Sequence, residues 1–273
     1  MKFFLLPLAL IFSAMPALLA VETAPVANPE LVVVLHGMGR TRWSMARLAG
    51  ALGREGYRVV NVSYPSRRAV ESLAAEWLPA QLAAAHAGAA PRVHFVTHSL
   101  GGIVVRAWLR EAGAPENLGR VVMLAPPNAG SEIAERLGPW APYRWFTGAN
   151  GARLGTGATA LPQTLGAWPA GGVDKRRSET GATSPQTLGA WPTDGVASAP
   201  GAGELGVIAG GRSLNPLLAA LLPRPNDGKV TVAATHLAGE TAHVTLPYTH
   251  TWLAWRSVTI ARVKSFLRTG RFA

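Results

Sequence analysis

A serine stands where a short β-branched run gives way to a helical stretch. The run ends at His98, the serine is Ser99, and Gly101 and Gly102 follow it. A serine on a tight strand-to-helix turn has a strained backbone, and it needs small neighbours because bulky ones would collide with adjacent elements. The positive end of the following helix would stabilise a developing oxyanion. These residue types predict that Ser99 is a nucleophile.

A serine hydroxyl needs a base, and the base needs an acid that orients it. The chain contains three aspartates, of which Asp174 and Asp194 lie in or beside a repeated segment. The third, Asp227, stands in a Pro-Asn-Asp-Gly turn sequence of the framework. We therefore expect Asp227 to be the acid, with Glu240 in the next loop as the alternative acid. A plain turn residue is the structural interpretation of Asp227.

The base must be one of seven histidines. His250 is the one that closes a predicted strand in the chain order Ser, Asp, His. His243, which opens the same strand, is the alternative base, and a helix-capping or buried imidazole is the structural alternative for His250. We expect His36 to be a structural hydrogen-bonding group rather than a base.

The elements that must position these residues follow from the spacing of the apolar residues. β-Branched runs alternate with Ala- and Leu-rich stretches at helical spacing, which is the pattern of a parallel sheet covered on both faces. Strands are predicted over residues 31–36, 57–64, 92–98, 120–125, 205–210 and 243–249. Helices are predicted over residues 43–52, 70–85, 100–112 and 251–267, with a short turn near 215–222. We expect a doubly wound, mostly parallel α/β sheet of about six strands, with ligands at the carboxyl ends of the strands.

Three segments resemble motifs of the bacterial lipases and esterases of the α/β-hydrolase superfamily. They are Leu35-His36-Gly37-Met38-Gly39, His98-Ser99-Leu100-Gly101-Gly102 and Asn226-Asp227-Gly228-Lys229-Val230. The resemblance covers most of the chain from residue 31 onward, and it implies an α/β-hydrolase fold. In the resembling enzymes, the amide after His-Gly and the amide after the nucleophile form the oxyanion hole, which implies Met38 and Leu100 here. The chain departs from the usual pattern at Thr97, where glycine is most common.

Composition excludes several classes of protein. The 273 residues are 48% hydrophobic and 15% charged, which is enough apolar material for a large buried core. The net charge of +11 is mostly scattered arginine, so it favours an anionic lipid or envelope surface as partner and argues against nucleic acid. Without cysteine there is no thiolate nucleophile and no Cys-ligated metal. We expect no cofactor and no metal.

The amino-terminal residues have the layout of a secretory signal. Residues 1–20 combine one cation, an apolar run and small residues near the end. We therefore expect a signal peptide over 1–20, a linker over 21–30, a single domain over 31–273, and a secreted or periplasmic protein. Because Leu18 stands three residues before the expected cut, an uncleaved membrane anchor is the alternative.

A Gly- and Pro-rich segment over about 148–203 interrupts the α/β pattern. It contains Pro-Gln-Thr-Leu-Gly-Ala-Trp-Pro twice, at 162–169 and 185–192. Two copies are too few for a solenoid, so we interpret the segment as a surface-loop insertion with a tandem duplication. In an alternative interpretation, Trp168 and Trp191 form a lipid-seeking flap. The aromatic residues just before the insertion would either line an acyl pocket or bury its base; they are Trp140, Trp145 and Phe146.

The predicted function is that of a secreted serine hydrolase that cleaves carboxylic esters, of lipid or acyl type, through an acyl-enzyme. The alternatives on the same residues are a lipid acyltransferase, in which an alcohol replaces water, and an amidase or thioesterase. A binding module without enzymatic activity is the alternative from another class, and the complete set of Ser99, Asp227 and His250 argues against it.

Overall fold

The computed structural model describes residues 28–169, 201, 203–214 and 222–273. The predicted signal peptide, the second copy of the repeat, Asp174 and Asp194 lie outside the described residues. Most of the short turn that was predicted near 215–222 lies outside them as well.

Six parallel strands form one sheet with the order β2-β1-β3-β4-β5-β6. The strands are β1 (Leu31–Leu35), β2 (Arg58–Asn61), β3 (Val93–His98), β4 (Leu118–Leu124), β5 (Leu205–Gly210) and β6 (Ala242–Leu246). Each of them was predicted, but β2 is shorter than the expected 57–64. Beyond its end, the Tyr64 amide donates to His36 Nε2, at 3.1 Å, rather than to a neighbouring strand. Strand β6 ends before Pro247, which has no amide hydrogen to donate to a ladder.

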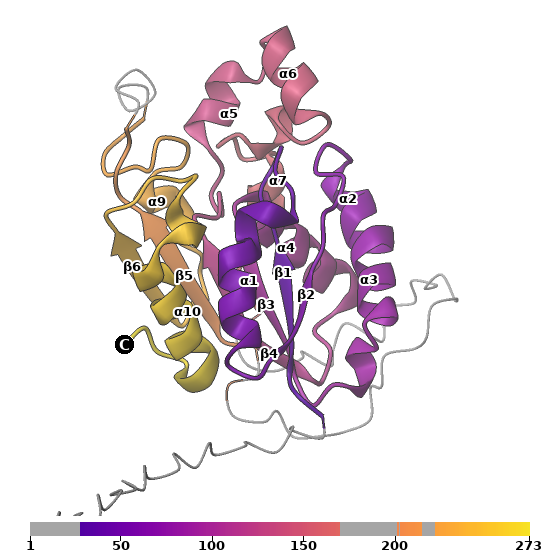
Figure 1. Ribbon diagram of the computed structural model, residues 1–273. Coiled ribbons are helices and arrows are strands. Elements are labelled where there is room, and N and C mark those ends of the chain that lie inside the picture. The colour runs from indigo at the N-terminus through magenta and orange to yellow at the C-terminus, as the bar shows by residue number, and fades with distance from the viewer. Residues whose placement is uncertain (1–27, 170–200, 202, 215–221) are drawn as a thin grey trace, which may run out of the picture.

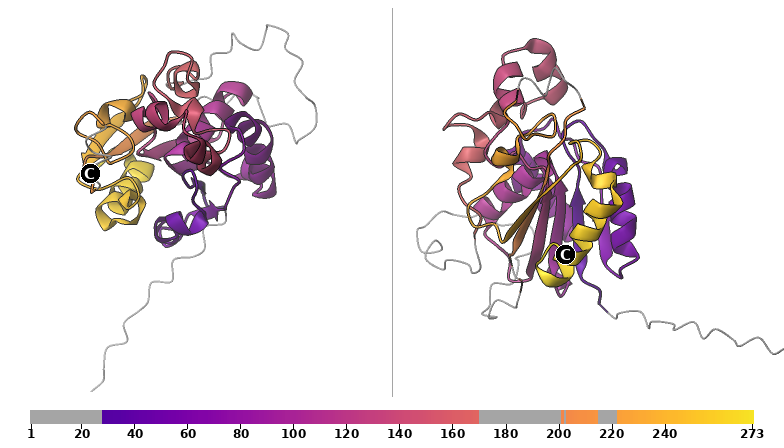
Figure 2. Two further views of the ribbon diagram at one scale, coloured as in Figure 1. Left: turned by 90° about the horizontal axis from the view of Figure 1, so that it is seen from above. Right: turned by 90° about the vertical axis from the view of Figure 1, so that its left-hand side faces the viewer.

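Helices cover both faces of the sheet, which confirms the doubly wound α/β architecture (Figure 2). One face carries α2 (Val70–Ser72), a π turn (Leu73–Trp77), α3 (Leu78–Ala84) and α4 (Leu100–Ala112). The other carries a 3-10 turn (Arg42–Met45), α1 (Ala46–Gly53), a second 3-10 turn (Leu253–Trp255) and α10 (Ser257–Thr269).

Two predicted helix boundaries were wrong. The helix expected over 70–85 is interrupted by the π turn, since Pro79 cannot donate the hydrogen bond that would continue a regular helix through this point. The helix expected from Thr251 begins at Ser257, and a 3-10 turn fills the gap.

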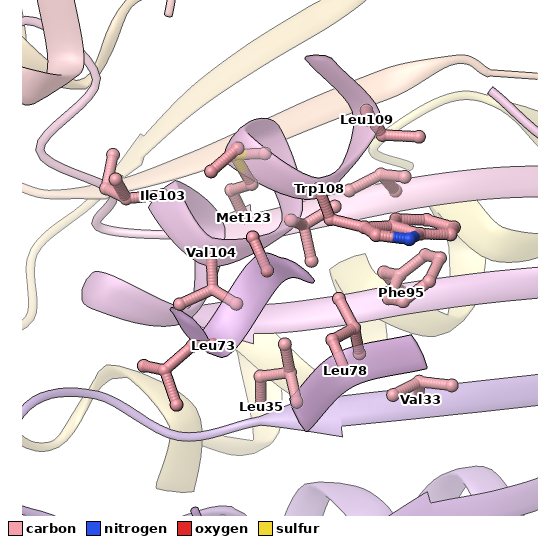
Figure 3. Close-up of a cluster of buried hydrophobic side chains, with 14 of the residues drawn as sticks. Val33, Leu35, Leu73, Leu78, Phe95, Ile103, Val104, Trp108, Leu109 and Met123 are labelled. Carbon is pink, nitrogen blue, oxygen red and sulfur yellow. The ribbon is translucent and has the colours of Figure 1, made fainter. Parts of the chain in front are cut away.

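The core between the sheet and α4 is apolar and holds the carboxyl end of β3 in place (Figure 3). Phe95 of β3 packs against Trp108 of α4 with ring centroids 5.4 Å apart. Leu35 and Met123, from the two strands beside β3, are fully buried in the same cluster, in register with Thr97. Burial of one such side chain contributes about 1.5–3 kcal/mol, so the turn after β3 is anchored by a rigid frame.

The chain between β4 and β5 forms a group of short helices beyond the carboxyl ends of the strands (Figure 1). They are α5 (Glu132–Leu137), α6 (Ala141–Thr147), a 3-10 turn (Ala152–Leu154) and α7 (Leu161–Thr164). Ser131 caps α5 by accepting a hydrogen bond from the Ala134 amide. In the described ranges, no helix is long and apolar enough to cross a bilayer.

The first copy of the repeat packs on the core, so its part of the predicted insertion is not a surface loop. Trp168 is 3% exposed, and its indole nitrogen donates to the Gly203 carbonyl at 2.6 Å. Arg106 of α4 donates to the carbonyls of Pro162 and Gly166, at 2.9 and 2.8 Å. The interpretation of Trp168 as a lipid-seeking flap is therefore wrong, because its ring is already buried in protein.

Candidate active site

Ser99 occupies a sharp turn between β3 and α4, as its glycine neighbours predicted. Its backbone has φ 52° and ψ −120°, a conformation that costs free energy for any residue with a side chain. A Cβ atom at Gly101 would lie 2.9 Å from Leu35 Cβ, so position 101 accepts only glycine without displacement. At Gly102, a Cβ would lie 3.3 Å from the Thr97 hydroxyl. Threonine therefore fits at position 97 because glycine stands at 102.

The turn after β1, residues 36–39, lies directly against Ser99; we call it the oxyanion turn. A Cβ at Gly37 would lie 3.2 Å from Ser99 Cβ. The amides of Met38 and Leu100 donate to no acceptor in the part of the chain that the structure describes, and the Ser99 hydroxyl likewise makes no hydrogen bond there. Two unused amide donors thus flank the serine.

Asp227 and His250 form a buried pair. Asp227 Oδ2 lies 2.7 Å from His250 Nδ1, and the two residues are 3% and 5% exposed. The other carboxylate oxygen accepts hydrogen bonds from the amides of Lys229 and Val230, each at 2.9 Å. The His250 amide also donates to the Asp227 carbonyl, at 3.1 Å. Since the carboxylate accepts at His250 Nδ1, the proton of the neutral ring is placed there and Nε2 keeps its lone pair.

His98 joins this pair to the serine turn, a contact that sequence reasoning missed. Its Nε2 lies 2.9 Å from the His250 carbonyl oxygen, across 152 positions of the chain. Burial, followed by the charge of His250, lowers the pKa of His98 well below its ordinary value, so the ring is neutral and donates. Only its place beside Ser99 could have drawn attention to it in the sequence.

His36 has the structural role that was expected. Its Nε2 accepts from the Tyr64 amide, and its Nδ1 donates to the Gly37 carbonyl at 2.8 Å. Its ring stacks on Tyr64, with centroids 4.2 Å apart. Burial lowers the pKa of His36, which keeps the ring neutral in this arrangement. His36 therefore shapes the oxyanion turn.

The alternative acid and base interact elsewhere. Glu240 accepts from His236 Nδ1 at 2.6 Å, and His243 Nε2 lies 2.9 Å from the Thr235 hydroxyl. The rings of His236 and His243 stack with centroids 3.8 Å apart. The structure thus brings Asp227, rather than Glu240, to His250.

Two further residues, which sequence reasoning did not identify, hold the oxyanion turn. The Ser66 hydroxyl accepts from the Gly39 amide at 2.9 Å. Asn150, which is fully buried, donates to the Ser66 carbonyl at 2.9 Å and accepts from the Val70 amide at 3.0 Å. The segment after α6 therefore supports the turn through Ser66.

Several large aromatic side chains on segments that follow β1, β4 and β6 are exposed. We call Trp43, Trp140, Trp145, Phe146 and Trp252, which are 51–74% exposed, the aromatic rim. Of the two alternatives for Trp140, Trp145 and Phe146, burial of the base of the insertion is therefore wrong. Residues 36–45, 138–151 and 250–256, from which the rim comes, contain no Asp or Glu. Arg42 lies over the Trp43 ring and Arg67 over the Trp145 ring, at 4.9 and 5.6 Å.

No group of three His, Asp or Glu side chains suited to a metal ion occurs among the residues that the structure describes.

Comparison with known proteins places the chain in a family. The profile of the Alpha/beta hydrolase family matches residues 32–262, which is most of the chain. The chain belongs to the alpha/beta hydrolase family. The family and the parallel six-stranded sheet agree with the fold expected from the three sequence motifs. No curated protein sequence matches this alpha/beta hydrolase.

Solved structures share the fold of this alpha/beta hydrolase at low sequence identity. Mature Bacillus licheniformis lipase BlEst2 is 19% identical, with a TM-score of 0.62, over 90% of this chain and 95% of its own. Phospholipase PlaB from Legionella pneumophila is 21% identical, with a TM-score of 0.51, over 77% of this chain and 45% of its own. Aspergillus fumigatus lipase B is 13% identical, with a TM-score of 0.53, over 88% of this chain and 52% of its own. The chain thus spans nearly all of BlEst2 but only about half of the other two.

Proposed function

We propose that this hydrolase is a serine esterase that acts on lipid or acyl esters outside the cytoplasm. The observation that carries the proposal is the buried Asp227–His250 pair. The His250 carbonyl is hydrogen-bonded to His98, which directly precedes Ser99. Export is supported by the signal-like composition of residues 1–20.

In the proposed mechanism, Ser99 Oγ attacks the ester carbonyl carbon while His250 Nε2 takes the hydroxyl proton. Asp227 stabilises the resulting imidazolium and holds its orientation. The amides of Met38 and Leu100, which are free to donate, bind the developing oxyanion. The ester C–O bond then breaks, and His250 gives the proton to the leaving alcohol. Water, activated by His250 in the same way, hydrolyses the acyl-enzyme.

The lipid part of the proposal is supported by the aromatic rim. Trp and Phe side chains partition into the interface of a lipid surface, and arginines such as Arg42 and Arg67, which lie over rim tryptophans, attract anionic lipid. Of the rim, Phe146 reaches over the oxyanion turn, since a Cβ at Gly39 would lie 2.7 Å from its ring. An ester in an anionic lipid surface would therefore contact the rim before it reaches Ser99. The names lipase and phospholipase of two neighbours are in accord with such a substrate.

The test uses a fluorophosphonate probe and a series of p-nitrophenyl esters of increasing chain length. We expect the probe to label the purified protein and to leave Ser99→Ala unlabelled. Ester hydrolysis should fall by about 10⁴-fold or more in that variant, while its circular dichroism is unchanged. Equal labelling of both proteins would reject Ser99 as the nucleophile. Products formed in the presence of added glycerol separate hydrolysis from acyl transfer.

A second experiment tests the lipid surface. Co-sedimentation is measured with vesicles of phosphatidylcholine alone and with phosphatidylglycerol added. We expect binding to the anionic vesicles to weaken several-fold in a Trp140→Ser, Trp145→Ser double variant. The matched control is Val258→Ser, an exposed apolar residue near the start of α10, on a different element from Trp140 and Trp145. If the control lost as much binding as the double variant, the rim would not be the contact surface.

A further inference from the structure

His98 touches three parts of the candidate site at once. It is the last residue of β3 and directly precedes Ser99. Its Nε2 lies 2.9 Å from the His250 carbonyl oxygen, and the two rings lie 4.8 Å apart. On the opposite side, a Cβ at Gly37 would lie 2.9 Å from His98 Nδ1. The ring therefore fills the space between the oxyanion turn and the loop that carries His250.

The hydrogen bonds of His250 explain why this contact matters. Its amide and its Nδ1 both bond to Asp227, which belongs to the loop after β5. Those bonds hold acid and base to each other but do not hold the pair to β3. Among the described residues, the bond from His98 is the hydrogen bond that connects His250 to the strand that ends at the serine.

The protonation of His98 suits a fixed donor. Burial is the main cause that keeps the pKa of His98 low; the charges of His250, Lys229 and Arg40 lower it further, and the hydrogen bond to the His250 backbone acts in the opposite direction. The ring is neutral, so it carries one N–H, and the His250 carbonyl requires that proton on Nε2. His98 is 4% exposed, which leaves water little access to this bond.

We propose that His98 is a positioning residue: its Nε2–H bond to the His250 carbonyl sets the placement of the Asp227–His250 pair relative to the Ser99 hydroxyl. This inference rests on the proposed function of that pair. Loss of the bond would let acid and base shift together while their mutual hydrogen bond stays intact. A displacement of about 1 Å between base and nucleophile can lower the rate by about 100-fold.

Two isosteres of histidine test the proposal. The side-chain amide nitrogen of glutamine can take the place of Nε2, whereas that of asparagine takes the place of Nδ1 and does not reach the His250 carbonyl. We expect His98→Gln to keep kcat within about threefold of wild type, and His98→Asn to lower kcat by about 100-fold with little change in KM. The rate of labelling of Ser99 by the fluorophosphonate probe should follow kcat in the same order.

A purely structural role predicts a different result. If His98 only fills space, both variants should lower the thermal midpoint and reduce activity equally, without rescue by glutamine. That result, or wild-type kcat in His98→Asn, would overturn the proposal. The NMR signal of the proton between His250 Nδ1 and Asp227 should persist in both variants, and its loss in His98→Asn would likewise count against positioning of an intact pair. Failure of the proposed function itself is seen separately, as a wild-type protein that neither hydrolyses esters nor reacts with the probe.

Discussion

Replacement of Asp227 by asparagine should invert the proton placement on His250, because the structure leaves the new amide one orientation. Oδ1 of Asp227 accepts from the amides of Lys229 and Val230, both at 2.9 Å. An NH₂ group at that position would face two donors, so it must take the place of Oδ2, which lies 2.7 Å from His250 Nδ1. There it donates to Nδ1, and the ring proton moves to Nε2. That nitrogen can then no longer take the proton of Ser99.

The expected effect is a loss of about 10⁴-fold in kcat, the cost of the wrong histidine tautomer in a serine hydrolase. At about 1.36 kcal/mol per tenfold in rate, this raises the activation free energy by about 5.4 kcal/mol. KM should change little, since Asp227 is buried behind His250 and makes no predicted contact with the ester. The fold should persist, because asparagine has the same shape and keeps the two amide bonds at Oδ1.

The assay is steady-state hydrolysis of a short p-nitrophenyl ester, with urea unfolding as a check on folding. Glu240→Gln is the matched control, since Glu240 was the alternative acid and pairs with His236 in the structure. We expect this control to stay close to wild-type activity. An Asp227→Asn enzyme within tenfold of wild type, or a Glu240→Gln enzyme as impaired as Asp227→Asn, would refute the reasoning.

Three further predictions concern the frame of the site. Deletion of Thr164–Gln186 leaves one copy of the repeat and puts Trp191 in the sequence position of Trp168, so ester hydrolysis should persist. The free energy of unfolding, measured in urea, should change by no more than about 0.6 kcal/mol, the loop-closure term for each halving of a connecting segment. A protein that fails to fold would contradict this. Because His98 is kept neutral by burial, the unfolded chain binds more protons than the native one below about pH 6.5, and the free energy of unfolding should fall between about pH 7 and pH 5, with a smaller fall in His98→Gln. Ser66→Ala removes the acceptor of an amide in the oxyanion turn and should lower kcat by about tenfold with KM unchanged; a raised KM with unchanged kcat would argue against that role.

The local sequence pattern was sufficient to predict the strands and the site residues whose positions have strict local requirements. Strand positions follow from β-branched runs, which any parallel sheet must bury on both faces. Ser99 could be predicted because its positive φ and the close approach of Leu35 demand glycine at 101, and that demand is visible in the sequence. Asp227 and His250 followed from their places after predicted strands, and the structure brings these two side chains to 2.7 Å.

Contacts between distant segments were decided by the tertiary structure alone. The bond from His98 to the His250 carbonyl spans 152 positions, and that from Asn150 to the Ser66 carbonyl spans 84. The sequence does not indicate these partners, because every residue has a backbone carbonyl and its identity does not show which side chain will donate to it. Trp168 shows the same limit: its Gly- and Pro-rich surroundings indicate a loop, yet the ring is 3% exposed and its indole nitrogen donates to the distant Gly203 carbonyl. Burial depends on what the rest of the chain places beside a residue, whereas backbone conformation and strand periodicity are properties of the residue and its immediate neighbours.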